Sequence, residues 1–169
     1  MLKLITLPGD IMKYQITPIR KDFLIKVRES GIDDQNQPIV HLIAEGGEPC
    51  RDVLRRAVAG EELILASYCP FSKPGPFKEY GAVYVLANQS DEAISYDQIL
   101  LASNSENDYF GDNLVLRAYD NEEGIYDARV VSPINAELTI SEFLAHSEVK
   151  FIMARFTAYG CYALRLDRK

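Results

Sequence analysis

Short patterned segments, separated by proline and glycine, constrain the fold of this chain more than any other feature of its sequence. The 169 residues include eight prolines and ten glycines, and these mark the boundaries between segments. The segments do not follow the regular strand–helix–strand alternation of a doubly wound parallel sheet. The sequence therefore predicts an α+β fold built on a largely antiparallel sheet, with about seven or eight short strands and about three helices.

Each predicted element rests on a local pattern of side chains. Runs rich in β-branched residues, or alternating apolar residues, predict strands over 2–7, 39–43, 62–68, 82–86, 114–119, 125–131, 149–156 and 161–166, with 14–17 extended. Apolar residues at helical spacing predict helices over 19–29, 49–58 and 136–146, and 95–101 is a further short candidate. No repeat or linker divides the chain. We expect one domain over residues 1–169, with 1–12 as an N-terminal extension.

Composition excludes several classes of function. Eighteen Lys and Arg against 25 Asp and Glu give a net charge of -7, which disfavours nucleic-acid binding but permits a local site for one small anion. No apolar stretch reaches the ~20 residues of a membrane span, and residues 1–10 are too soon interrupted by proline and glycine for a signal peptide. We expect a cytoplasmic protein that does not bind membranes. Whether the protein forms a homo-oligomer stays open, because no feature of the sequence favours one.

Cysteine and histidine are scarce and scattered. The three cysteines, Cys50, Cys69 and Cys161, lack the spacing of a disulfide framework. His41 and His146 lie far from any second ligand at metal-binding spacing. We therefore expect no disulfide, no metal site and no cofactor. His41, in the middle of an apolar strand, is expected in the core.

Several short motifs together resemble a known family. They are Pro49-Cys50-Arg51, Gly60-Glu61, Tyr68 before Pro70, Pro74-x-Pro76-Phe77-x-Glu79-x-Gly81, Leu116-Arg117-x-Tyr119, Tyr159-Gly160-Cys161-Tyr162 and Arg165-x-Asp167. In this order they resemble the bacterial domain of unknown function 1203 family, from about residue 14 to the C-terminus. The resemblance implies a single soluble bacterial domain and brings no activity. Relatives often carry a further cysteine three residues after Cys50 and after Cys161, where this chain has Val53 and Leu164.

Arginine and tyrosine side chains suggest a binding site for a small anion. Arg117 and Tyr119 point to one side of the strand predicted over 114–119, and Arg155 occupies a similar place on the strand predicted over 149–156. We predict that these three side chains line one shared concavity, where guanidinium groups bind carboxylate or phosphate. One alternative is that they lie on the wet face of a sheet. Another is that Asp120, Asp127 or Asp167 fills the concavity, which makes the cluster a structural ion-pair network.

Two further residues extend the proposed anion site. Arg51 lies with Arg55 on one face of the helix predicted over 49–58, whose start can also bind an anion. Tyr159 stands next to Gly160 in a tight turn or bulge. A solvated charged face and a purely structural turn are the alternatives for these two residues. Our leading hypothesis is a small-molecule or anion-binding domain, and whether it is an enzyme stays open.

Two alternative functions use other residues. A cysteine-dependent enzyme would use Cys50, at the start of the predicted helix, or Cys161 as its nucleophile. The helical spacing of residues 50, 53, 54 and 57 favours instead a Cys50 that packs inward. A protein-interaction module would use the proline loop, residues 70–77, to display Phe71 and Phe77. Such phenylalanines can also tuck under the loop and attach it to the core.

Overall fold

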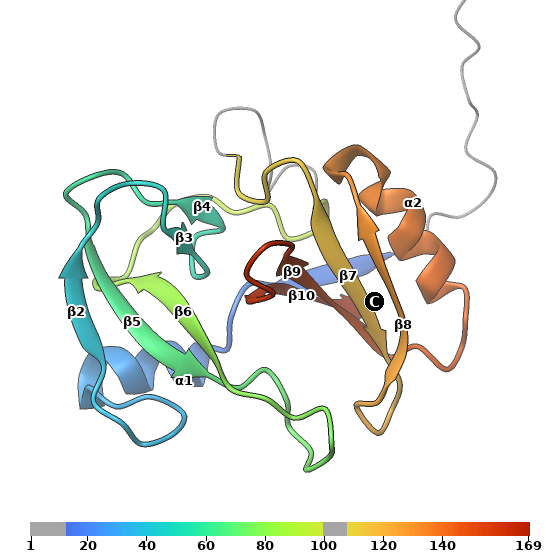
Figure 1. Ribbon diagram of the computed structural model, residues 1–169, viewed down its shortest axis with the longest axis horizontal. Helices are drawn as coiled ribbons and strands as arrows, with labels where there is room; N and C mark the ends of the chain where they lie inside the picture. The colour runs from blue at the N-terminus through green and yellow to red at the C-terminus, as the bar shows by residue number, and fades with distance from the viewer. Residues whose placement is uncertain (1–12, 100–107) are drawn as a thin grey trace, which may run out of the picture.

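The computed structural model describes residues 13–99 and 108–169, which form ten strands and a few short helices (Figure 1). The strands are β1 (Tyr14–Thr17), β2 (Val40–Ile43), β3 (Pro49–Cys50), β4 (Arg55–Arg56), β5 (Glu62–Tyr68), β6 (Gly81–Leu86), β7 (Leu114–Tyr119), β8 (Ile125–Val131), β9 (Phe151–Phe156) and β10 (Tyr162–Arg168). The helices are α1 (Lys21–Ile25), continued by the π-helical turn η1 (Lys26–Ser30), and α2 (Pro133–Leu144).

The strands form two five-stranded sheets. Sheet I has the order β1-β10-β9-β7-β8, and all its neighbouring strands are antiparallel. Sheet II has the order β2-β5-β6-β3-β4, in which only β3 and β6 run parallel. The α+β class and the antiparallel pairing are confirmed. The single sheet of seven or eight strands is a wrong prediction, because the same short strands divide between two sheets.

Alternating side chains place sheet I between two cores. Leu116 on β7 and Ile152 on β9 belong to a core that α2 covers with Ile140 and Phe143. On the opposite face of sheet I, Phe151, Met153 and Tyr119 pack with residues of sheet II. The sheet II side chains in this shared core include Ile64, Val83 and Val85. The two sheets are therefore joined by one continuous apolar contact.

The first helix follows the sequence prediction closely. Ile19, Phe23 and Val27, spaced by four residues, are all buried in the core between the sheets. The helical segment ends at Gly31, whose φ of 65° lies in the left-handed region that glycine adopts readily. Residues 19–29 thus bury the stripe that their spacing predicted.

Residues 49–58 are a tight hairpin, and the predicted helix is wrong. Pro49 pairs with Arg56 and Cys50 with Arg55, and the turn between the strands includes Leu54 at a φ of 52°. Parallel pairing of Cys50 with Tyr84 on β6 attaches the hairpin to sheet II. Ladder hydrogen bonds to a strand distant in sequence thus outweigh the local helical spacing. Cys50 and Leu54 are nevertheless buried, as that spacing predicted.

Some smaller predictions can also be compared with the structure. Residues 95–99 are not helical, while the predicted strand 2–7 and residues 100–101 lie outside the described part of the chain. His41 is exposed on β2, an edge strand, so its predicted place in the core is wrong. Within residues 13–99 and 108–169, no helix is long and apolar enough to cross a bilayer.

Candidate functional site

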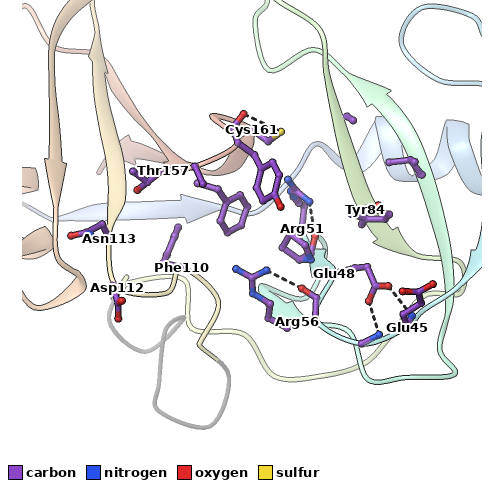
Figure 2. A pocket seen from close by; sticks show the side chains of 18 residues that line it. Glu45, Glu48, Arg51, Arg56, Tyr84, Phe110, Asp112, Asn113, Thr157 and Cys161 are labelled. Carbon is purple, nitrogen blue, oxygen red and sulfur yellow. Dashed lines mark hydrogen bonds between the residues drawn. The ribbon is translucent and has the colours of Figure 1, made fainter.

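A cleft of about 720 Å³ lies where the hairpin of β3 and β4 meets the end of sheet I. Figure 2 shows Arg51 and Arg56 between Phe110 and Thr157 on one side and Tyr84 on the other. The lining residues come from residues 45–49, 51 and 56, from β5 and β6, from the segment 110–113, and from the end of β9 with the turn that follows it. Both sheets therefore contribute to the walls of the cleft.

Arg51 is the most buried charged residue of this cleft, with 2% of its surface exposed. Its Nε donates to the carbonyl of Tyr162 at 2.8 Å and its Nη1 to the carbonyl of Pro49 at 2.6 Å. Nη2 has no hydrogen-bond partner among the described residues. The guanidinium lies 5.0 Å from the ring centre of Phe156. Burial lowers the pKa of Arg51, but an arginine stays charged at neutral pH.

Arg56 lies over the same aromatic ring, 5.5 Å from the centre of Phe156. It donates from Nη1 to the carbonyl of Gly47 at 2.8 Å and from Nη2 to that of Tyr109 at 3.0 Å. Neither Arg51 nor Arg56 forms an ion pair with a described carboxylate, whereas seven of the ten arginines do. The cleft thus contains two cations whose protein partners are backbone carbonyls.

Acidic side chains occupy the rim of the cleft. Glu45 and Asp112 are exposed there. Glu48 accepts hydrogen bonds from the backbone N–H groups of Glu45 at 2.8 Å and Gly46 at 3.0 Å. Slight burial acts to raise the pKa of Glu48, but the backbone hydrogen bonds outweigh it and lower that pKa. Glu48 is therefore held by backbone donors and forms no ion pair with either arginine.

The turn between β9 and β10 closes one end of the cleft. Gly160 adopts a φ of 70°, and Tyr159 before it is 88% exposed at the rim. Cys161 follows, half-buried, and its thiol donates to the carbonyl of Tyr159 at 3.7 Å. Both residues also border a second cavity of about 170 Å³, whose wall includes Arg155. The turn thus separates two neighbouring cavities.

Arg117 and Arg155 lie close together, and a carboxylate already joins them. Both lie on the face of sheet I toward sheet II, on the neighbouring strands β7 and β9. Glu79 forms an ion pair with Arg155 and approaches Nη1 of Arg117 at 4.0 Å. Nε of Arg155 is buried without a partner in the described residues. Glu79, from the loop before β6, therefore takes the place that we assigned to a ligand anion.

Tyr119 does not line a shared concavity, so this part of the prediction is wrong. The side chain is fully buried, and its ring stacks on Phe151 with a centroid distance of 5.0 Å. Phe71 packs edge-on against the same ring at 5.6 Å. Tyr119 is on the predicted face of its strand, but sheet II covers that face.

The three cysteines are free thiols in different environments. Cys50 is fully buried in β3, and burial raises the pKa of its thiol to about 12. The predicted helix start that would activate Cys50 is absent, since residues 49–58 form a hairpin. Cys69 is also buried, and only Cys161 is partly accessible. In residues 13–99 and 108–169, no three His, Cys, Asp or Glu side chains cluster as metal ligands do.

The proline loop is attached to sheet I by a buried carboxylate. Glu123 accepts hydrogen bonds from the backbone N–H groups of Ser72 and Lys73 at 3.1 and 2.9 Å. Phe71 is buried against the core, whereas Phe77 is 45% exposed. Of the two phenylalanines proposed for display, only Phe77 reaches solvent.

Sequence reasoning missed the aromatic wall of the cleft. This wall consists of Phe110, Phe156 and Tyr84. In the sequence, each of them is indistinguishable from an ordinary apolar residue of a strand or loop. The adjacent glycines Gly46 and Gly47 were the one signal in the sequence for this part of the cleft. Such a pair favours an irregular turn, and both residues adopt positive φ in the turn that leads to Arg51.

Comparison with known proteins gives a family and nothing more specific. No curated protein and no solved structure matches the chain. One family model, described as a protein of unknown function (DUF1203), matches residues 47–168, which include both cleft arginines and the turn that carries Tyr159 and Cys161. The chain therefore belongs to the DUF1203 family.

Proposed function

We propose that this protein binds a small anionic molecule in the cleft lined by Arg51 and Arg56. The observation that carries the proposal is the pair of arginines with no carboxylate partner among the described residues. A buried charge is costly to desolvate unless an opposite charge or several hydrogen bonds compensate. Backbone carbonyls supply part of this compensation, and an anion at Nη2 of Arg51 supplies the rest.

The dimensions and the walls of the cleft suit a small molecule. Its volume of about 720 Å³ lies within the ~300–1,000 Å³ that is usual for ligand pockets. Phe110, Tyr84 and Tyr159 offer apolar contact area around the charged floor. Aromatic rings and a guanidinium favour a ligand with a planar carboxylate or a phosphate. Tyr159, highly exposed at the rim, contacts the ligand from outside.

Arg155 and Arg117 have an indirect role in this proposal. Arg155 borders the smaller cavity on the other side of the turn, where it pairs with Glu79. Its Nη1 also donates to the carbonyl of Gly160 at 3.1 Å, so it positions the turn that carries Tyr159. Arg117 supports Glu79 from the neighbouring strand. Tyr119 contributes only to the core beneath these groups.

A thermal-shift screen tests the proposal. The panel contains aliphatic and aromatic carboxylates and phosphates, each with its uncharged amide or alcohol as a control. A ligand at 100 times its Kd adds about 2.7 kcal/mol to the folded state, enough for a clear rise in Tm. We expect hits among the anions and not among their uncharged counterparts, followed by measurement of Kd by calorimetry.

A matched pair of arginine variants identifies the cleft as the site. Arg168, outside the cleft, resembles Arg56 because among the described residues it also donates only to backbone carbonyls, those of His146 and Val149, both at 3.0 Å. We expect Arg56→Gln and Tyr159→Ala each to raise the Kd about tenfold or more, and Arg168→Gln to leave it unchanged. If no anion binds, or if Arg56→Gln behaves like Arg168→Gln, the proposal is wrong.

The cysteine-dependent enzyme remains a second proposal, and it rests on Cys161. This thiol borders the cleft, whereas Cys50 is buried with a raised pKa. A general base is needed beside such a nucleophile. Neither His41 nor His146 is among the residues that line the cleft. Cys161→Ser distinguishes the two proposals, because it abolishes a thiol reaction but spares reversible binding of the anion.

A further inference from the structure

Strand β8 forms an open edge of sheet I, on the opposite side of that sheet from β1. It is the last strand in the order of the sheet, as Figure 1 shows, and no described strand pairs with its outer side. Most of its side chains are exposed, among them Val130 at 62% and Tyr126 at 41%. A seven-residue edge strand presents unpaired N–H and C=O groups to which another strand can bind.

The main chain of β8 points away from β7 at Ala128. In antiparallel sheets, the N–H and C=O groups of successive residues point to alternate neighbours. The carbonyl of Tyr119 accepts from Lys150, on the β9 side of β7. By this alternation and the register of β7 with β8, the main chain at Asp127 and Arg129 points to β7 and that of Ala128 points outward. Consistently, the Ala128 N–H donates to the Asp127 carboxylate at 2.7 Å.

The sequence of β8 is self-complementary about Ala128. It reads Ile125-Tyr126-Asp127-Ala128-Arg129-Val130-Val131: two apolar residues, an acid, alanine, a base and two apolar residues. An antiparallel partner of the same sequence, centred on Ala128, places Asp127 opposite Arg129 on each side. These two residues then form non-hydrogen-bonded pairs, in which facing side chains are closest. The regular part of β8 runs from Asp127 to Val131, because Tyr126 lies at a bulge where the register with β7 shifts.

We propose that β8 pairs antiparallel with β8 of a second copy of this chain, and that the two copies of sheet I form one ten-stranded sheet. A two-fold axis at Ala128 relates the copies. Each copy contributes an Asp127 to the Arg129 of the other, and the central Ala128 residues exchange their N–H···O hydrogen bonds. These contacts replace two that Asp127 makes within its own chain, with the Ala128 N–H at 2.7 Å and with Arg129 at 3.6 Å. The interface lies on the edge of sheet I and does not include the residues that line the anion cleft, so it does not depend on the proposed ligand.

The helix beside β8 extends the same interface. Arg129 forms an ion pair with Glu142 of α2, and its guanidinium lies 5.0 Å from the ring centre of Phe143. The two-fold arrangement places both α2 helices on the same face of the joined sheet. With strands spaced ~4.8 Å apart, their axes come roughly 10 Å from each other, the distance of packed helices. Leu138 on α2 is 55% exposed.

Two charge variants that complement each other test the proposal. Asp127→Arg places arginine opposite arginine in its own dimer, and Arg129→Asp places aspartate opposite aspartate. We expect each variant alone to have a dimer dissociation constant at least about tenfold above that of the wild type, because like charges then face each other twice. In a 1:1 mixture of the two variants both cross-strand pairs become opposite in charge. We expect this mixture to form a heterodimer, measured by native mass spectrometry and by light scattering after size exclusion.

A second pair of variants does not depend on Arg129, which also contacts α2. Val130→Lys puts a charge into the proposed interface, and Val58→Lys makes the same change at a valine of similar exposure, 65% against 62%, away from β8. We expect only Val130→Lys to reduce dimerisation, with the Tm of both variants near that of the wild type. A wild type that stays monomeric as its concentration rises overturns the proposal. The proposal is also overturned if the charge variants dimerise alone or if their mixture stays monomeric. The same holds if the two lysine variants dimerise to the same extent.

Discussion

Arg51 shows how one buried side chain can define a site. Its guanidinium connects the two sheets, since it donates to Pro49 on β3 and to Tyr162 on β10. Fixing the group in this way leaves Nη2 preorganised toward the cleft. By contrast, Arg155 is buried to a similar degree but has a carboxylate partner in Glu79. The difference in partners, rather than in burial, separates the candidate binding residue from the structural one.

The cysteines provide a prediction at the scale of single residues. Cys161 is partly accessible, whereas Cys50 and Cys69 are buried and the pKa of Cys50 is raised to about 12. Because the thiolate is the reactive form, we expect iodoacetamide at neutral pH to modify Cys161 first in the native protein. Mass spectrometry of peptides from native and urea-unfolded samples measures this order. Rapid native modification of Cys50 would contradict its burial.

The β3–β4 hairpin is an element held in place by charged side chains. Arg55 donates to both oxygens of Glu61, at 2.8 and 2.7 Å, and also to Glu92 at 2.6 Å. Glu61 in turn accepts from the backbone N–H of Val58 at 2.7 Å. These contacts connect the hairpin to the start of β5 and to the segment after β6. They stabilise a short element whose local spacing favours a helix.

The pKa of Glu61 gives a prediction for this element. The hydrogen bonds from Arg55 lower the pKa of Glu61 to about 2, whereas an unfolded glutamate titrates near about 4.3. A lowered carboxyl pKa stabilises the fold above the unfolded value, and this contribution is lost as the pH falls from about 4.3 toward about 2. We expect Glu61→Gln to lower the free energy of unfolding at pH 6, and the difference from the wild type to vanish near pH 2.

Urea unfolding between pH 2 and pH 6 measures this convergence. Glu62→Gln is the matched control, because Glu62 is the next residue in the chain, is exposed and forms no ion pair within the described residues. Its unfolding free energy should follow that of the wild type throughout. A Glu61→Gln difference that persists unchanged at low pH would show that the ion pair does not hold the hairpin.

At the scale of the whole molecule, the two sheets depend on one shared core. Met153 and Phe151 of sheet I pack with Ile64 and Val85 of sheet II and with Phe23 of α1. The proline loop and Arg51 add polar connections between the sheets. Neither sheet therefore has its own complete core on the face that meets the other.

This architecture predicts cooperative unfolding. Met153→Ala removes a fully buried side chain between the sheets, and such truncations cost about 2–5 kcal/mol. We expect a single transition at lower denaturant, with equal loss of amide protection in β5 and β9 as measured by hydrogen exchange. Val58→Ala, at a site 65% exposed, should change the unfolding free energy by less than about 0.5 kcal/mol. Separate transitions for the two sheets would contradict a shared core.

The sequence alone determined the elements whose patterns are strong and local. The apolar run of residues 62–68 is strand β5, Phe23 and Val27 are buried on a helix with Ile19 buried just before it, and residues 114–131 form a hairpin. In these segments the side-chain period and the turn residues favour one backbone conformation. The family resemblance was confirmed for the same reason, since it rests on ordered local motifs.

Only the tertiary structure decided how these elements assemble. Residues 49–58 have helical spacing, yet parallel pairing of Cys50 with Tyr84 makes them a hairpin. Tyr119 points to the predicted side of its strand, but the presence of sheet II turns that side into core. Partners distant in the sequence determine which polar faces meet water and which arginines find a carboxylate. The period of a strand fixes the direction of each side chain, but what lies in that direction depends on contacts that no local pattern contains.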